Sequence, residues 1–401
     1  NNPLVIGFTH AKTELTLNNK HMEQKKRKLN IWGHRALVAM LLIPAVAILL
    51  SINSCKTESA KQKVSFEVQH LDWVYPATLY EVNVRQFTPQ GTFAAFGEHL
   101  PRLKKLGIDI LWLMPIHPIG EVNRKGTLGS YYSIKDYKGI NPEFGNMDDF
   151  KAIVKKAHEL GMEVIIDWVA NHSAHDNALA TSNPEFYVKD STGKFVSPFD
   201  WTDVIKFDYS NPKMREYMFD ALEFWIRDIG IDGFRCDVAS EVPTDFWNEA
   251  RTRLDKIKPV FMLAESENIK LQEFAFDAEY GWEFHHVMNK TAKGEKNSSD
   301  LDKYFEKSLL NFPPNTIHIQ FTSNHDENSW NGTEFERLGD GAKAFAVLSF
   351  MVPGMPLLYN GQEVGFNKRL EFFDKDQIIW KDNNNFEEFY TKLIALRKRN
   401  S

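Results

Sequence analysis

The chain has 401 residues, of which 43% are hydrophobic and 25% charged, and its formal net charge is -6. This is a globular composition, long enough for one large domain with a substantial core. The negative charge argues against nucleic acid as a partner. The two cysteines, Cys55 and Cys236, exclude a disulfide framework, and Cys236 lies in an apolar run that predicts a small buried side chain.

The N-terminal region has the pattern of a targeting sequence. Residues 24–28 are basic, residues 36–50 are apolar and uncharged, and the small and polar run SINSC ends at Cys55. This order predicts an export signal over residues 22–54, with an apolar run shorter than the about 20 residues of a spanning helix. The region resembles a bacterial lipoprotein signal, which implies cleavage before Cys55 and lipid on its sulfur. An uncleaved membrane anchor is the alternative, because the ending INSC departs from the preferred lipobox.

Met22 opens the basic segment and is interpreted as the natural start, which leaves residues 1–21 as an upstream non-native segment. Residues 55–72 are polar and charged, as expected of a tether. The expected location is therefore outside the inner membrane, as a membrane-anchored lipoprotein on the periplasmic or cell-surface side.

From Pro76 onward, strand-like runs alternate with helical periodicity. The predicted strands are residues 77–87, 108–115, 163–172, 233–239, 259–266, 274–280, 316–324 and 355–361. The predicted helices are residues 93–107, 147–161, 212–230, 243–257 and 385–399, with weaker helical patterns between the sixth and seventh strands. Such alternation predicts a parallel sheet, and eight units predict an α/β fold, a (β/α)8 TIM barrel over residues 73–401. Residues 173–208 show no clear helical pattern. A doubly wound open sheet is the alternative fold.

Ionisable side chains gather where four of the predicted strands end. They are Asp167 and His172 on the third strand, together with the polar Asn171; Arg235 and Asp237 on the fourth; Glu265 on the fifth; and His325 and Asp326 on the seventh. In a barrel these ends meet at one rim, where catalytic groups lie. One such acid alone would more often be a helix cap or half of an ion pair, but four strands together favour a shared cleft.

Crowded carboxyl groups suit the chemistry of a glycosidase. One ionised acid can attack a sugar while a protonated one assists the leaving group. Arg235 lies two residues before Asp237, so both side chains point to the same face of a strand, and the guanidinium is expected to keep Asp237 ionised. The alternative is an ion pair that only locks the barrel.

Four motifs carry a family resemblance in the family's own order. They are DWVANH (167–172), GFRCDVA (233–239), MLAE (262–265) and FTSNHDEN (321–328), and YNGQEVG (359–365) is a further similar segment. Through them, residues 73–401 resemble the α-amylase family of glycoside hydrolases, family 13. The resemblance also implies that residues 173–208 form the small subdomain that the family inserts after its third strand.

The resemblance implies roles for individual residues. Asp237 matches the nucleophile, Glu265 the general acid/base and Asp326 the transition-state stabiliser. The expected sugar contacts are Arg235, His172, His325 and the stacking Tyr132, for which Tyr131 is the competing choice, and Asp167 has a supporting role. The mechanism would be retaining, with two carboxyl groups about 5–5.5 Å apart.

The chemistry implied by the resemblance needs no cofactor, but many relatives bind a structural calcium ion at the residue matching Asn171. Asp176, Asn177 and Asp200 are nearby oxygen donors, without a defined ligand spacing.

The sequence departs from the family pattern in two features. Residues 240–241 are Ser-Glu, where starch-cleaving members often have Lys-His. No β-sandwich follows the last helix, so a C-terminal truncation is expected.

The preferred interpretation is a hydrolase that cleaves starch-derived α-1,4-glucans and maltooligosaccharides and is held at a membrane by its lipid anchor. A transglycosylase or an α-1,6-cleaving enzyme of the same fold, acting on pullulan or cyclodextrin, is the enzyme alternative. The non-enzyme alternative is an inactive transporter-associated or glycan-binding barrel. Such a barrel is expected to have lost catalytic acids, whereas this chain retains all three.

Overall fold

The computed structural model of the chain describes residues 68–313 and 315–400. The predicted signal segment, Cys55 and most of the predicted tether lie outside these residues, so those predictions are untouched by the fold. Among the described helices, none combines the length and the apolar character needed to cross a bilayer.

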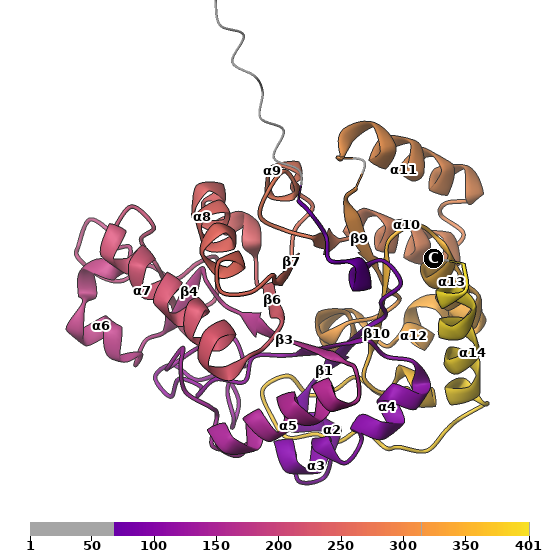
Figure 1. Cartoon of the computed structure of the whole chain (residues 1–401), viewed down its shortest axis with the longest axis horizontal. Coiled ribbons are helices and arrows are strands. Elements are labelled where there is room, and N and C mark those ends of the chain that lie inside the picture. The colour runs from indigo at the N-terminus through magenta and orange to yellow at the C-terminus, as the bar shows by residue number, and fades with distance from the viewer. Residues whose placement is uncertain (1–67, 314, 401) are drawn as a thin grey trace, which may run out of the picture. The chain divides into compact units, whose positions relative to one another are not determined.

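Eight parallel strands close into a barrel, as predicted, and the open-sheet alternative is wrong (Figure 1). Around the ring the order is β1, β2, β3, β6, β7, β8, β9 and β10, and β10 pairs again with β1. Their bounds are β1 Leu79–Val82, β2 Ile110–Leu113, β3 Glu163–Trp168, β6 Gly233–Cys236, β7 Phe261–Ala264, β8 Ala278–Tyr280, β9 Ile317–Gln320 and β10 Met355–Tyr359.

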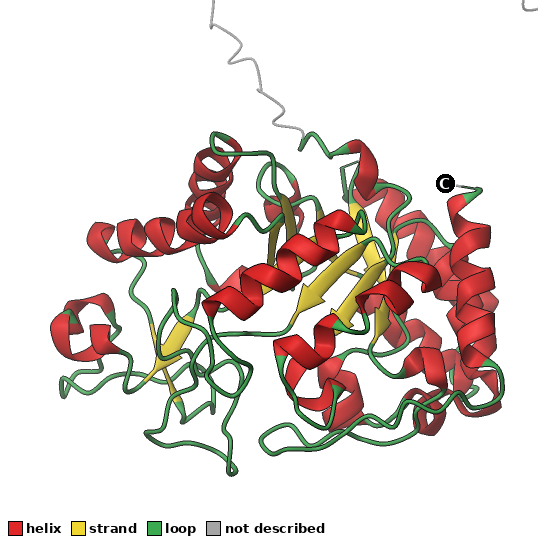
Figure 2. Ribbon diagram, turned by 60° about the horizontal axis from the view of Figure 1, so that its bottom comes forward, coloured by secondary structure: helices red, strands yellow, loops and turns green. Residues whose placement is uncertain are grey.

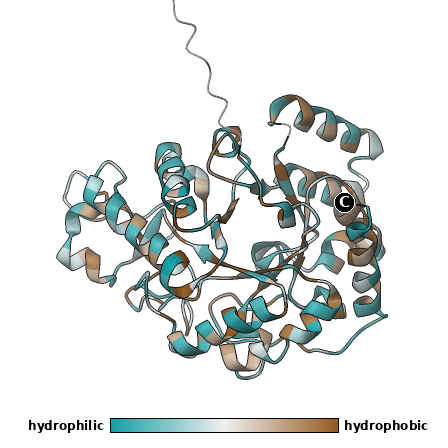
Figure 3. Cartoon of the chain, viewed as in Figure 1, coloured by the Kyte–Doolittle hydropathy of each residue, from teal (hydrophilic) through white to brown (hydrophobic). Residues whose placement is uncertain are grey.

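Helices surround the barrel and connect its strands (Figure 2). Hydrophobic and hydrophilic residues alternate along them, as expected of helices with one face on a core (Figure 3). The helices are α2 Val84–Phe87, α3 Phe93–Gly97, α4 Leu100–Leu106, α5 Met147–Glu159, α6 Ala178–Ser182, α7 Pro212–Phe224, α8 Thr244–Asp255, α9 Ile269–Gln272, α10 Trp282–Ala292, α11 Ser298–Asn311, α12 Glu334–Leu338, α13 Ala342–Met351 and α14 Phe386–Lys398.

The hydrophobic core has two layers because strand side chains alternate between the two faces of the barrel wall. One layer fills the barrel interior and includes Leu79, Ile110, Ile165, Leu263 and Ile319. The other lies between the strands and the helices. Because the barrel interior is closely packed, its strands are rigid and hold the groups at their ends in fixed positions.

Several predicted boundaries differ from the structure. The predicted strand 77–87 ends at Val82, because the Asn83 side chain accepts the backbone N–H of Gln86 and caps α2. The predicted strand 163–172 ends at Trp168. The predicted helix 93–107 is two helices, α3 and α4, and the weakly patterned stretch before β9 holds two helices, α10 and α11.

Two chain segments extend beyond the carboxyl ends of the barrel strands. The predicted insert contains a two-stranded antiparallel sheet, β4 His172–Ala174 with β5 Val204–Lys206, and one short helix, α6, that the pattern did not reveal. After β2, the backbone N–H of Gly120 donates to the carbonyl of Ser133 at 2.8 Å, and Ile119 pairs with Ile134. We call residues 118–135 the β2 hairpin.

Candidate active site

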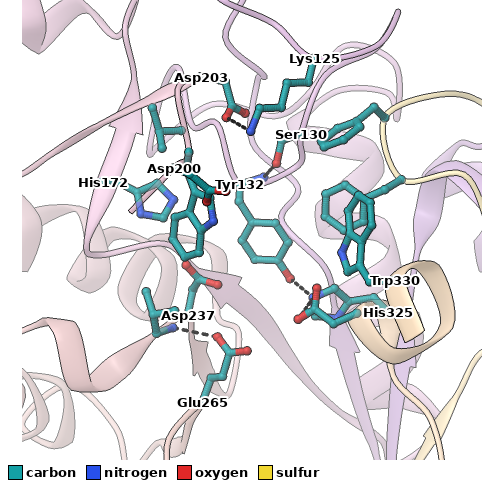
Figure 4. Close-up of a pocket in the computed structure, with 16 residues that line it drawn as sticks. Lys125, Ser130, Tyr132, His172, Asp200, Asp203, Asp237, Glu265, His325 and Trp330 are labelled. Carbon is teal, nitrogen blue, oxygen red and sulfur yellow. Dashed lines mark hydrogen bonds and ion pairs between the residues drawn. The ribbon is translucent and has the colours of Figure 1, made fainter. Parts of the chain in front are cut away.

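A pocket of about 400 Å³ lies at the carboxyl ends of the strands (Figure 4). Six of the predicted site residues line it: Tyr132, His172, Asp237, Glu265, His325 and Asp326. Arg235 and Asp167 are fully buried and contact this group. Residues separated by up to about half the chain therefore meet in one place.

Arg235 is the centre of the charge network. Its Nη1 lies 2.9 Å from Asp167 Oδ1 and 3.2 Å from Asp237 Oδ1, and its Nη2 lies 2.9 Å from Glu265 Oε1. The Nε–H also donates to the Tyr280 hydroxyl at 3.2 Å. One buried guanidinium thus faces three acids, which is more than the simple Arg235–Asp237 pair that the strand pattern predicted.

The carboxyl group of Glu265 is held by the backbone beside Asp237. The N–H of Val238 donates to Glu265 Oε2 at 2.8 Å. Val238 has φ 37° and ψ 49°, a left-handed conformation that is uncommon for a β-branched residue. Such strain is retained where the surrounding structure imposes it, and here it aims the N–H at the predicted acid/base. Nothing in the sequence marked Val238 for this role.

His325 lies between two further acids. Its Nδ1 is hydrogen-bonded to Glu81 of β1, and its Nε2 lies 2.8 Å from the Tyr132 hydroxyl and 3.3 Å from Asp326 Oδ2. Glu81 is fully buried and was not predicted to belong to the site. The signal for it was an acid inside an otherwise apolar strand, because a buried carboxylate needs a partner.

Tyr132, rather than the competing Tyr131, lines the pocket. Its hydroxyl lies 3.0 Å from Asp167 Oδ2, whereas the Tyr131 ring is buried with the guanidinium of Arg85 4.2 Å from its centroid. The Tyr132 ring stacks at 5.5 Å from the His325 ring. Tyr132 is therefore the aromatic face that a sugar in the pocket would meet.

Burial and neighbouring charges shift the pKa values of two of the acids, Asp237 and Asp326. Burial and the nearby Glu265 raise the pKa of Asp237 well above its usual value, and Arg235 only partly opposes this. Burial also raises the pKa of Asp326. Arg235 was expected to keep Asp237 ionised, but its guanidinium is shared among three acids, and burial together with Glu265 outweighs its effect on the pKa of Asp237.

The two pocket histidines are perturbed in opposite directions. The pKa of His325 rises to about 9 against the cost of burial, because Asp326 and Glu81 stabilise the imidazolium. Burial lowers the pKa of His172 to about 3. His325 is thus a cation and a donor near neutral pH, whereas His172 is neutral.

The residues proposed for calcium do not form a matching cage. Asn171 Oδ1 is buried without a hydrogen-bond partner, which is what a ligand oxygen would look like. However, Asp176 pairs with Lys135 at 3.1 Å, and Asn177 caps α6. Within residues 68–313 and 315–400, the set of three His, Cys, Asp or Glu ligand atoms within 4.8 Å of one another is His158, Glu163 and Asp232, at the opposite end of β3.

The comparisons with known proteins agree with this geometry. The model of the family described as "Alpha amylase, catalytic domain" matches residues 73–203 and 182–401. The chain belongs to the α-amylase family. Among solved structures, an α-amylase from Lactobacillus plantarum is 37% identical with a TM-score of 0.75, and the match covers 81% of this chain and 80% of that one. A maltogenic α-amylase from Thermotoga neapolitana is 34% identical with a TM-score of 0.76, covering 81% and 77% of the two chains.

Curated members of the family are more distant. The α-amylase MalA of Haloarcula japonica is 27% identical, over 81% of this chain and 49% of its own length. A cyclomaltodextrinase from a Bacillus species is 27% identical, over 81% of this chain and 66% of its own. A neopullulanase from Thermoactinomyces vulgaris is 28% identical, over 75% and 55%. The chain thus spans about half to two thirds of the length of these relatives.

Proposed function

We propose that this chain is a retaining glycoside hydrolase that cleaves α-glucosidic bonds in starch-derived α-1,4-glucans and maltooligosaccharides. The observation that carries the proposal is the meeting of Asp237, Glu265 and Asp326, from three strand ends, around one pocket. Tyr132 also lines this pocket, and the buried Arg235 contacts Asp237 and Glu265. The amylase relatives support the substrate class.

In the first step, the carboxylate of Asp237 attacks the anomeric carbon and the bond to the leaving oxygen breaks. Glu265 gives its proton to that oxygen, and a covalent glycosyl-enzyme forms. Because Asp237 and Glu265 interact, the proton belongs to the pair, and the mechanism requires it on Glu265 at this stage. Asp326 and the stacked Tyr132 would face the oxocarbenium-like charge of the transition state.

In the second step, Glu265 takes a proton from water, and the hydroxyl replaces Asp237 at the anomeric carbon. The Val238 N–H keeps the Glu265 carboxyl in one orientation for both steps. The anomeric configuration is retained because the carbon is inverted twice. No cofactor takes part, since the two carboxyl groups and water supply every proton and electron pair.

The proposal is tested by incubating the enzyme with amylose, pullulan and maltotriose and following the products by chromatography and NMR. We expect shortened α-glucans that are released as the α-anomer. Products released as the β-anomer contradict a retaining mechanism.

A second candidate is cleavage of α-1,6 bonds or of cyclodextrins. It is favoured by the relatives named cyclomaltodextrinase and neopullulanase, and by residues 240–241, where Ser240 contacts Ser266 and Glu241 pairs with Lys206 of the insert. These groups lie just past Asp237 and would meet the acceptor part of the substrate. Maltotriose released from pullulan, whose maltotriose units are joined by α-1,6 bonds, or linear products from β-cyclodextrin, would identify this activity.

We further propose that the protein is exported and held at a membrane by lipid on Cys55, as the sequence pattern of residues 22–55 indicates. Expression with a radiolabelled fatty acid tests this. Label in the native chain but not in a Cys55→Ser variant supports the anchor, and membrane association of an unlabelled, uncleaved chain supports the alternative anchor helix.

A further inference from the structure

The β2 hairpin lines the pocket through Lys125 and Ser130 and is attached to the rest of the barrel on both sides. On one side, Lys125 Nζ lies 3.0 Å from Asp203 Oδ1 of the insert. On the other side, the backbone N–H of Leu128 donates to the carbonyl of Phe373 at 3.0 Å, and that of Thr127 donates to Asp374 Oδ1 at 2.8 Å. The hairpin therefore joins the insert to the loop that follows β10.

The contact with the loop after β10 is close. Gly126 has φ 62°, and a Cβ on it would lie 2.5 Å from the Cβ of Phe373. The glycine thus allows the two backbones to touch. Lys125, Ser130, Asp203 and Phe373 all line the pocket, so the hairpin and its two attachments form a wall of the site itself.

The position of Glu265 shows which part of a substrate this wall would meet. Glu265 must protonate the bond that breaks, so the leaving part of the substrate lies beside Glu265 and Val238. The retained donor part lies on the Tyr132 side of Asp237. In Figure 4, the Lys125–Asp203 pair and Glu265 lie at opposite ends of the view, with Tyr132 between them.

An aromatic surface continues the donor side. The ring of Phe372 lies 6.2 Å from that of Tyr132 with an interplanar angle of 12°, and Trp330 lies 5.1 Å from Phe372. Trp330 is 52% exposed and lines the pocket, as a stacking surface for sugar would. A pocket of about 400 Å³ is at the small end for a ligand site, which fits a short donor segment.

We propose that the β2 hairpin closes the donor end of the pocket, with the Lys125–Asp203 pair as its latch. The site would then accept the non-reducing end of an α-glucan and exclude segments from the middle of a chain. This inference rests on the proposed function and specifies the substrate class of that site.

The test uses two versions of p-nitrophenyl maltoheptaoside on the full-length enzyme. One has a free non-reducing end, and the other carries a 4,6-O-ethylidene group there. We expect the blocked substrate to be cleaved at least about tenfold more slowly, because the group meets the hairpin wall. Equal rates on the two substrates overturn the closed donor end.

A pair of variants tests the latch. Lys125→Ala should raise the rate on blocked relative to free substrate by about two- to fivefold, the effect of losing one partly exposed ion pair. Lys138→Ala is the control, because Lys138 is a similarly exposed lysine that pairs with Asp220 of α7 and does not line the pocket. An unchanged ratio in Lys125→Ala, or an equal change in Lys138→Ala, contradicts the latch.

Failure of the proposed function is recognised separately. If the native enzyme cleaves neither heptaoside, nor amylose, pullulan or maltotriose, the hydrolase proposal is contradicted. Calorimetric binding of free and ethylidene-blocked maltoheptaose to Asp237→Asn then still decides the closed end: weaker binding of the blocked sugar supports it, and equal binding overturns it.

Discussion

At the scale of single residues, the site depends on one cation, Arg235, that contacts several acids at the same time. Arg235 contacts Asp167, Asp237 and Glu265, so no acid has the guanidinium to itself. The pocket is therefore rich in negative charge, and a developing positive charge on a bound sugar is the species that it would stabilise best. The arrangement fits a transition state more closely than it fits a neutral substrate.

Asp237→Asn tests the nucleophile. We expect turnover to fall by about 10⁴-fold or more, because an amide cannot form the glycosyl-enzyme, while the melting temperature stays near that of the native protein. Glu265→Gln is the matched comparison on p-nitrophenyl maltoside, whose leaving group needs little protonation. It should retain more activity than Asp237→Asn, and a reversed order would contradict the two assignments.

The pH dependence follows from the direction of the Asp237 shift. An attacking carboxylate must be ionised, and its raised pKa means that it takes up a proton at a higher pH than an ordinary aspartate, whose pKa is 3.8. Activity is therefore lost on acidification earlier than for an unperturbed acid. A profile of kcat/KM against pH should show its acidic limb well above pH 4, and constant activity down to pH 4 would contradict this.

The sequence predicted individual site residues better than their partners. Asp237, Glu265 and Asp326 follow strands, and the rule that barrel strands end at one rim places them together. Glu81 and the Val238 N–H were missed, because their roles depend on contacts across the ring and on a left-handed φ. Such features arise only when the distant segments are packed.

At the scale of elements, strand cores were predictable and strand ends were not. Apolar runs marked all eight strands, since buried parallel strands are continuously hydrophobic. The first predicted strand was too long because Asn83 starts a helix by accepting one N–H. A local cap of this kind ended the strand inside the predicted segment 77–87, so the strand-like pattern alone could not locate the boundary.

Strand packing gives an element-scale prediction at Gly233, the first residue of β6. A Cβ there would lie 1.8 Å from the carbonyl oxygen of Phe261 on β7. Gly233→Ala should therefore lower the free energy of unfolding by about 3 kcal/mol or more, because the two strands must separate. Thermal unfolding of the purified variant measures this.

Gly193→Ala is the control for that substitution. Gly193 also has a positive φ, 86°, but open space surrounds its Cβ position. It should cost about 1 kcal/mol, the strain of the backbone conformation alone. Equal losses in the two variants would show that the close approach of β6 and β7 is unimportant.

At the scale of the whole molecule, the last helix completes the ring. Lys398 of α14 donates to the carbonyl of Gly107 at 2.7 Å and to Asp109 at 2.6 Å, and both acceptors immediately precede β2. Contacts between residues about 290 positions apart thus join the last described helix to the segment before the second strand of the barrel. The alternation of strands and helices predicted this closure, although not the side chains that make it.

Lys398→Ala should reduce stability by about 1–3 kcal/mol, the range for hydrogen bonds of a charged group. Lys392→Ala on the same helix is the control, because the Lys392–Glu388 pair is exposed and local. Its melting temperature should be unchanged. If the two variants have the same melting temperature, the contact between α14 and the segment before β2 does not stabilise the barrel.

The buried guanidinium of Arg235 has a consequence for how the enzyme fails under heat. Its counterions come from β3, β6 and β7, whose mutual positions exist only in the closed ring. Separation of any two of these β-strands would leave unpaired charges in a hydrophobic interior. A partly opened barrel is therefore a state of high free energy. Thermal inactivation should then coincide with global unfolding, without an earlier loss of the catalytic groups alone.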